Sequence, residues 1–269
     1  MKIIIMEKYI EVNRDLWNKK TPVHVTSEFY DVPSFKKGKS SLNPAELEAL
    51  GDVSGKSLLH LQCHFGLDSL SWARLGAKVT GVDLAEKAID AAKELNSELG
   101  LDAEFICSNV YDLKNVLDKK FDIVFTSYGT IGWLPDMDRW ADIVSHFLKP
   151  GGIFFIAEFH PVRWMYDDDC VKMDYSYFNI EPIIEEVGHS YADKDRAINQ
   201  LSYGWNHPLS DVFSALMKQN LQVTEFKEYP YSYYKCFNNT VQNELGYYEI
   251  KGIEGKMPLM YSIKAIKPK

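Results

Sequence analysis

Polar side chains that could hold a ligand follow two neighbouring apolar runs of this chain. The first run, at 58–61, is followed by Gln62, Cys63 and His64, with Gly66 in the same loop. The second run, at 78–82, ends in Asp83. A carboxylate at that place can accept hydrogen bonds from both hydroxyls of a ribose. These residues predict a nucleoside-binding site at the ends of two strands.

The pattern around these residues predicts the elements that position them. An apolar run typical of a buried strand at 58–61 gives way to helical spacing at 67–74, and Gly76 then ends the helix. A second strand follows at 78–82. Strand, loop, helix and strand form the βαβ unit, which binds ligands at the carboxyl ends of its strands, beside a helix N-terminus.

The glycine content of the loop narrows the ligand class. A nicotinamide-binding loop requires G-x-G-x-x-G, so that backbone can approach a pyrophosphate, whereas Gln62 and His64 occupy the corresponding places and only Gly66 is a glycine. This argues against a nicotinamide dehydrogenase. S-adenosylmethionine is a nucleoside cofactor without phosphates and needs less room.

The same run resembles motif I of the class I S-adenosylmethionine-dependent methyltransferases, in the branch that carries L-Q-C-H-x-G. Here it reads L-Q-C-H-F-G at 61–66, and the looser resemblance extends from Trp17 to the last strand. It implies that the loop residues Gln62, Cys63, His64 and Gly66 line the methionine end of the cofactor. It also implies that Asp83, with the adjacent Leu84, contacts the ribose.

Two later strand ends add residues to the same edge. Asn109 and Val110 follow the strand expected at 103–108, where the amide could bond the adenine amino group and Val110 could cover the ring, although Asn109 could instead only turn the chain. The apolar run 121–127 opens onto a glycine-punctuated loop that resembles motif IV of the family. Ser127 and Tyr128 would then face the sulfur.

Methyl transfer is an in-line displacement that depends mainly on positioning. Tyr128, Trp133, Trp17 and Tyr30 could stabilise the sulfonium through their aromatic faces and contact the substrate, or could equally pack the core. His160, after the strand expected at 153–159, is the candidate general base, with Glu158 to orient it; alternatively, His160 only hydrogen-bonds the following turn. No metal is predicted, because a strand-to-loop break separates His60 from His64.

The resemblance and the periodicity together predict an α/β fold. We expect a Rossmann-like, seven-stranded, mostly parallel sheet with an antiparallel last strand, helices on both faces and an inserted cap. Residues 1–50 would form an N-terminal helical lid segment and 51–269 the methyltransferase domain, with the cap at about 161–206 and a long loop at about 230–258. The aromatic and acidic residues of the cap suggest an acceptor with an apolar body and an amine end, although a solvated acidic run is equally consistent.

Composition limits the partners. A net charge of −8 over 269 residues gives no basic field for nucleic acid and suits a small-molecule acceptor. Four scattered cysteines indicate free thiols in the cytoplasm, and three consecutive isoleucines near the start are far short of a membrane span. The leading prediction is a methyltransferase acting on a small molecule; the alternative is a non-catalytic cofactor-binding or interaction module. Acceptor atom and oligomeric state stay open.

Overall fold

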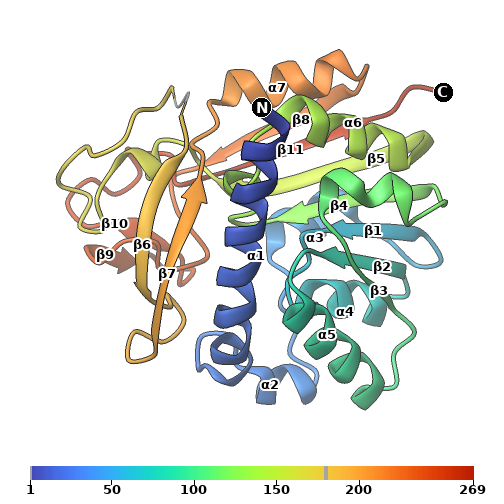
Figure 1. Cartoon of the computed structure of the whole chain (residues 1–269), viewed down its shortest axis with the longest axis horizontal. Helices are drawn as coiled ribbons and strands as arrows, with labels where there is room; N and C mark the ends of the chain where they lie inside the picture. Colours follow the sequence, from blue (N-terminus) through green and yellow to red (C-terminus); the bar gives the residue numbers. More distant parts are fainter. Residues whose placement is uncertain (1, 179–180) are drawn as a thin grey trace.

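A seven-stranded sheet forms the centre of the computed structural model, which describes residues 2–178 and 181–269 (Figure 1). Its strands follow the order β3-β2-β1-β4-β5-β11-β8. β11 is antiparallel to both neighbours, whereas the pairs from β3 to β5 are parallel. This confirms the predicted mostly parallel sheet with an antiparallel last strand. The bounds are β1 (Ser57–Leu61), β2 (Lys78–Asp83), β3 (Glu104–Cys107), β4 (Phe121–Ser127), β5 (Leu148–Phe159), β8 (Gln222–Tyr229) and β11 (Met260–Ile266).

Helices cover both faces of the sheet, because the central strands are apolar on both sides. Leu59 and Val124 pack into the core shared with α6 and α7, whereas Leu58 and Phe125 pack into the core beneath α3 and α4. The helices are α1 (Lys2–Thr26), α2 (Val32–Lys36), α3 (Pro44–Leu50), α4 (Leu67–Arg74), α5 (Glu86–Glu98), α6 (Met137–Phe147) and α7 (Leu209–Lys218). Short 3₁₀ helices lie at η1 (Val110–Asn115), η2 (Ile131–Trp133) and η3 (Arg163–Met165).

The N-terminal segment expected at 1–50 begins with one long helix, since α1 runs from Lys2 to Thr26. Two amides on α1 hold the helix against other elements. Asn13 exchanges hydrogen bonds of 2.8 and 2.9 Å with the backbone of Tyr203 on β7, and Asn18 bonds Glu86 and the Lys87 N–H at the start of α5. Figure 1 shows α1 between the sheet and the β6–β7 hairpin. These tertiary bonds stabilise a helix whose own apolar pattern is weak.

The segment around Pro150 belongs to a strand and not to a separate turn. α6 ends at Phe147, and β5 begins at once with Leu148, so that Pro150 and the glycines after it form the first part of the strand. The β4–β5 register shifts there, which lets Gly151 adopt φ 80° within the strand.

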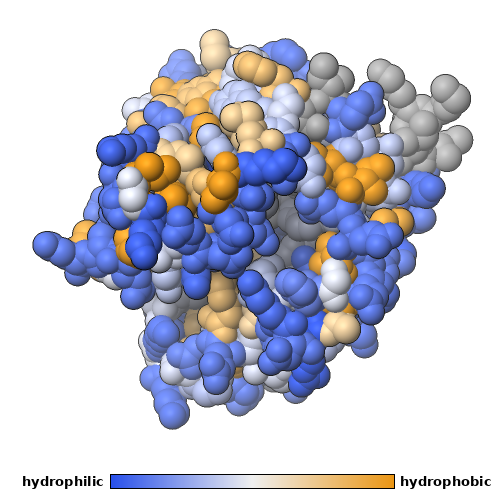
Figure 2. Space-filling model, turned by 90° about the vertical axis from the view of Figure 1, so that its left-hand side faces the viewer, coloured by the Kyte–Doolittle hydropathy of each residue, from blue (hydrophilic) through white to orange (hydrophobic). Residues whose placement is uncertain are grey.

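Two antiparallel hairpins lie outside the sheet. β6 (Ile183–His189) pairs with β7 (Ala197–Gly204), and β9 (Thr240–Gln242) pairs with β10 (Tyr248–Ile250). Figure 2 looks onto this side and shows a largely hydrophilic face with separate hydrophobic patches and a hollow near its middle. Among the helices of the described residues, none has the length and apolar character needed to cross a bilayer.

Candidate functional site

The loop after β1 has a glycine-like backbone although two of its residues are not glycine. Gln62 and His64 have φ angles of 56° and 51°, and Gly66 has φ 83°. A left-handed conformation costs a residue with a Cβ roughly 1–2 kcal/mol. A Cβ at Gly66 would also lie 2.9 Å from the Phe105 ring. The loop therefore keeps a turn that the missing glycines would have provided without strain.

Asp83 holds this loop from the end of β2. Its Oδ2 accepts the His64 N–H at 2.8 Å and its Oδ1 accepts the Ala85 N–H at 2.9 Å. Burial raises the pKa of the carboxyl to about 6, against the effect of these N–H donors. Each oxygen keeps a further lone pair for a ligand. The neighbouring Leu84 accepts a bond from the Cys107 thiol through its carbonyl.

The other loop residues differ in where they point. Cys63 is buried in the core cluster that contains Phe105, so its side chain packs beneath the loop. The Gln62 Nε2 donates to the Thr130 carbonyl at 2.8 Å, which ties the loop to the segment after β4. Within the described chain, Gln62 Oε1 and His64 Nδ1 are buried without a hydrogen-bond partner. Buried polar atoms of this kind fit a site that a polar ligand completes.

The strand end at β3 is built as a turn. The Asn109 Oδ1 accepts the Tyr111 N–H at 3.1 Å, and its Nδ2 donates to Asp112, so Asn109 caps η1. Val110 is buried in the main core. This is the arrangement of the alternative interpretation, and contact with adenine stays a prediction.

The end of β4 contacts two carboxylates that the sequence analysis missed, a half-buried one at Asp68 and a buried one at Glu46. Ser127 Oγ donates to Asp68 Oδ2 at 2.9 Å, and Tyr128 Oη donates to Glu46 Oε2 at 2.7 Å. Glu46 on α3 is fully buried, and desolvation, together with the nearby Asp68, raises its pKa to about 8. Tyr128 itself has φ 39°. The site therefore contains a strained tyrosine backed by a proton-accepting group.

The expected pairing of Glu158 with His160 is wrong. Glu158 is buried and accepts the backbone N–H groups of residues 129, 130, 131 and 159, because it lies beneath the loop after β4. The His160 Nε2 instead contacts Glu228 Oε1 at 3.0 Å, and its Nδ1 accepts the Val162 N–H. His160 thus hydrogen-bonds the following turn, and desolvation lowers its pKa despite Glu228.

Aromatic residues from distant segments gather over His64, and we call this group the lid cluster. The Trp17 ring centroid lies 5.2 Å from His64 and 5.4 Å from Trp133, and Tyr30 lies 5.7 Å from His64. The structure thus brings three of the predicted substrate residues together beside the loop. Two further members, which the sequence analysis missed, complete the lid cluster: His24 and Tyr191.

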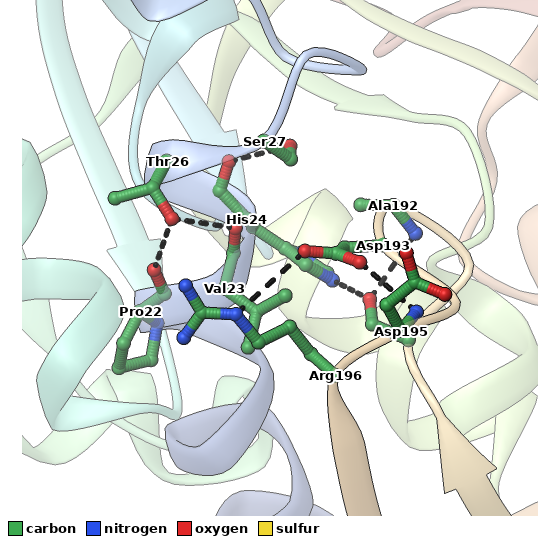
Figure 3. Close-up of polar contacts among 10 residues, drawn as sticks. Pro22, Val23, His24, Thr26, Ser27, Ala192, Asp193, Asp195 and Arg196 are labelled. Atoms are coloured by element: carbon green, nitrogen blue, oxygen red, sulfur yellow. Dashed lines mark hydrogen bonds and ion pairs between the residues drawn. The ribbon is translucent and has the colours of Figure 1, made fainter.

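His24 connects the lid cluster to the cap. Its Nδ1 lies 2.8 Å from His64 Nε2, and its Nε2 lies 2.8 Å from Ser190 Oγ. Figure 3 shows His24 pointing from the end of α1 toward the turn that carries Ala192 and Asp193. Burial lowers the pKa of His24 to about 3, so the ring is neutral and transmits hydrogen bonds without carrying charge.

Comparison with known proteins gives a consistent result. Residues 59–156 match the family described as "Methyltransferase domain". The "Ubiquinone biosynthesis O-methyltransferase" of Xanthomonas euvesicatoria pv. vesicatoria is 31% identical over 172 residues, which cover 63% of this chain and 70% of that protein. The protein of the same name from Chromobacterium violaceum is 32% identical over 133 residues, 48% of this chain; the match spans only 57% of that relative's length.

Solved structures share the fold at low sequence identity. An S-adenosylmethionine-dependent methyltransferase from Mesorhizobium loti has a TM-score of 0.58 at 17% identity, covering 86% of this chain and 99% of that one. The glycopeptide N-methyltransferase MtfA complexed with S-adenosylmethionine has a TM-score of 0.55 at 16% identity, covering 83% and 92%.

Proposed function

The chain belongs to the class I S-adenosylmethionine-dependent methyltransferases, and we propose that it methylates a small molecule held beside the end of β4. Its cofactor is S-adenosylmethionine, which supplies an electrophilic methyl group on a sulfonium when bound. The observation that carries the proposal is the contact between Tyr128 and the buried Glu46 at this edge. A tyrosine hydroxyl backed by a carboxylate suits an acceptor that must lose a proton.

We assign the cofactor contacts from the geometry of the four strand ends of β1 to β4. The methionine end would lie against Gln62, His64 and Gly66, with Cys63 supporting the loop from beneath. The ribose would bond Asp83 beside Leu84, and the adenine would lie near Asn109 and Val110. Ser127 and Tyr128 would border the sulfur. The partnerless Gln62 Oε1 and His64 Nδ1 support this assignment, because a polar ligand would satisfy both.

Positioning is the main contribution of the protein. Orientation of reacting groups can lower a barrier by roughly 7–11 kcal/mol in favourable cases. Trp17, Tyr30 and Trp133 would exclude water from the reacting atoms, because their rings close over the loop. Glu158 would keep the 129–131 backbone in place through its N–H bonds.

Proton removal would pass through Tyr128. As the acceptor's O–H or N–H group attacks the methyl carbon, its proton goes to Tyr128 Oη while the tyrosine proton passes to Glu46 Oε2. The bound cofactor would supply the methyl group, and Glu46 would later release the proton to solvent. We propose this pair in place of His160, because His160 is occupied by Val162 and Glu228.

Two kinds of observation bear on the chemical class of the acceptor. The two relatives are named O-methyltransferases, which makes a hydroxyl-bearing small molecule the leading candidate. Asp68 and Glu46 beside the tyrosine rings favour an amine as the second candidate, since aromatic faces and carboxylates both attract ammonium groups. We also propose a cytoplasmic location and a small-molecule partner in place of nucleic acid, on the grounds of the acidic composition.

A panel of phenols, alcohols, amines and thiols tests the proposal. Formation of S-adenosylhomocysteine would be measured with each acceptor, for the wild-type chain and for Tyr128→Phe. We expect turnover with a hydroxyl or amine acceptor and a loss of turnover in the variant. Saturable cofactor binding without turnover on any acceptor would favour the alternative of a non-catalytic module.

A further inference from the structure

Burial of the charged Lys20 side chain, on α1, costs desolvation free energy. The residue is 5% exposed, and its ammonium lies 5.0, 5.4 and 5.6 Å from the ring centroids of Trp17, Trp133 and Tyr191. In the described part of the chain, no carboxylate comes within ion-pair distance of it. A buried ammonium is normally paired, whereas the Glu185 carboxylate acts on Lys20 only from beyond ion-pair distance, so the aromatic cage leaves much of its burial cost uncompensated.

The surroundings of Lys20 indicate which ligand group could balance its positive charge. The rings around the ammonium are those of the lid cluster, and Trp17 packs directly on His64 of the cofactor loop. Burial lowers the pKa of both His64 and His24, and the nearby charge of Lys20 lowers both further. A cation is therefore held above the loop where the methionine end of the cofactor would lie.

We propose that Lys20 binds the α-carboxylate of the cofactor's methionine portion. This contact would come from α1 and not from the β1–α4–β2 unit that carries the cofactor loop. This inference rests on the proposed function and adds a residue to the same site. An amino-acid zwitterion presents both a carboxylate and an ammonium. Lys20 offers the cation, and the partnerless buried Gln62 Oε1 offers an acceptor for the ammonium.

The cofactor is a better source of the carboxylate than the acceptor. The Lys20 cage borders His64, whereas the groups that would face the acceptor, Tyr128 and Glu46, form a separate hydrogen-bonded pair at β4 and α3. Binding at Lys20 would couple retention of the cofactor to the position of α1 over the loop.

Calorimetry with two ligands tests the inference. S-adenosylhomocysteine contains the methionine-derived carboxylate and ammonium, and 5′-methylthioadenosine lacks both. In Lys20→Met, which keeps the apolar stem and removes the charge, we expect the affinity for S-adenosylhomocysteine to fall roughly 10- to 100-fold. The affinity for 5′-methylthioadenosine should change less than about 2-fold, because it makes no charged contact with residue 20.

The matched control is Lys19→Met, because Lys19 is a neighbouring lysine whose Nζ bonds Gln200 Oε1 at the surface. Both affinities should stay at the wild-type level in this control. Equal weakening of both ligands in Lys20→Met would overturn the inference, since the residue would then only support the fold. An unchanged affinity for S-adenosylhomocysteine together with a raised acceptor KM would also overturn it, in favour of an acceptor carboxylate. Wild-type protein that binds neither ligand would refute the proposed function itself.

Discussion

Glu158→Gln tests the way in which the protein holds the loop after β4. The carboxylate accepts the N–H groups of Gly129 and Phe159 on Oε1, and those of Thr130 and Ile131 on Oε2. The Thr130 hydroxyl also donates to Oε2 at 3.1 Å. Every partner is a donor, so an ionised, acceptor-only group satisfies all of them.

An amide can satisfy only one side of this arrangement. If the Gln oxygen takes the Oε2 side, its NH₂ faces the N–H groups of Gly129 and Phe159, and two charge-assisted hydrogen bonds are lost. Each such bond contributes about 1.5–3 kcal/mol. We therefore expect the free energy of unfolding to fall by roughly 3–6 kcal/mol, a large part of the total of about 5–15 kcal/mol for a typical protein.

Urea unfolding followed by tryptophan fluorescence measures this change. Glu104→Gln is the matched control, because Glu104 pairs with Lys119 at the surface and such pairs contribute roughly 0–1 kcal/mol. A Glu158→Gln variant within about 1 kcal/mol of wild type would refute the reasoning, since the loop would then not depend on the carboxylate.

Two further predictions concern the same site. Glu46→Gln should lower turnover by roughly 10²–10⁴-fold. In the wild-type chain, turnover should rise as the pH increases through about 8, because Glu46 accepts the proton only when it is ionised. A pH–rate profile that is the same in both proteins would contradict this role of Glu46. His64→Gly should be more stable than His64→Ala by about 1 kcal/mol in urea unfolding, because residue 64 has φ 51°, and equal stabilities would show that the loop relaxes.

Local patterns predicted the central unit well. The apolar runs at 58–61 and 78–82 reflect burial of both sheet faces, and they identified β1 and β2. The helical spacing between them identified α4. The expected antiparallel last strand is β11, which pairs with β8, and no helix lies between these two strands in the described chain. Both features depend on residues close together in the chain.

Contacts between distant residues could not be predicted in the same way. Glu46 and Tyr128 are 82 positions apart, and His24 and Ser190 are 166 apart. In the structure Glu46 has a local partner, the Asn43 N–H of the capping box, and a distant one, the Tyr128 hydroxyl, which no local pattern indicates. Likewise, Glu158 and His160 share a strand face in sequence terms, yet each is satisfied by other partners.

The central claim is that Asp83 holds the ribose of the cofactor at the edge of the sheet. Calorimetric titration with S-adenosylhomocysteine tests it in the wild-type chain, in Asp83→Asn, and in the control Asp52→Asn, whose exposed carboxylate only bonds the Ser54 N–H. The account predicts saturable binding by wild type and the control, and an affinity at least about 10-fold weaker in Asp83→Asn. Equal binding by all three proteins would contradict it.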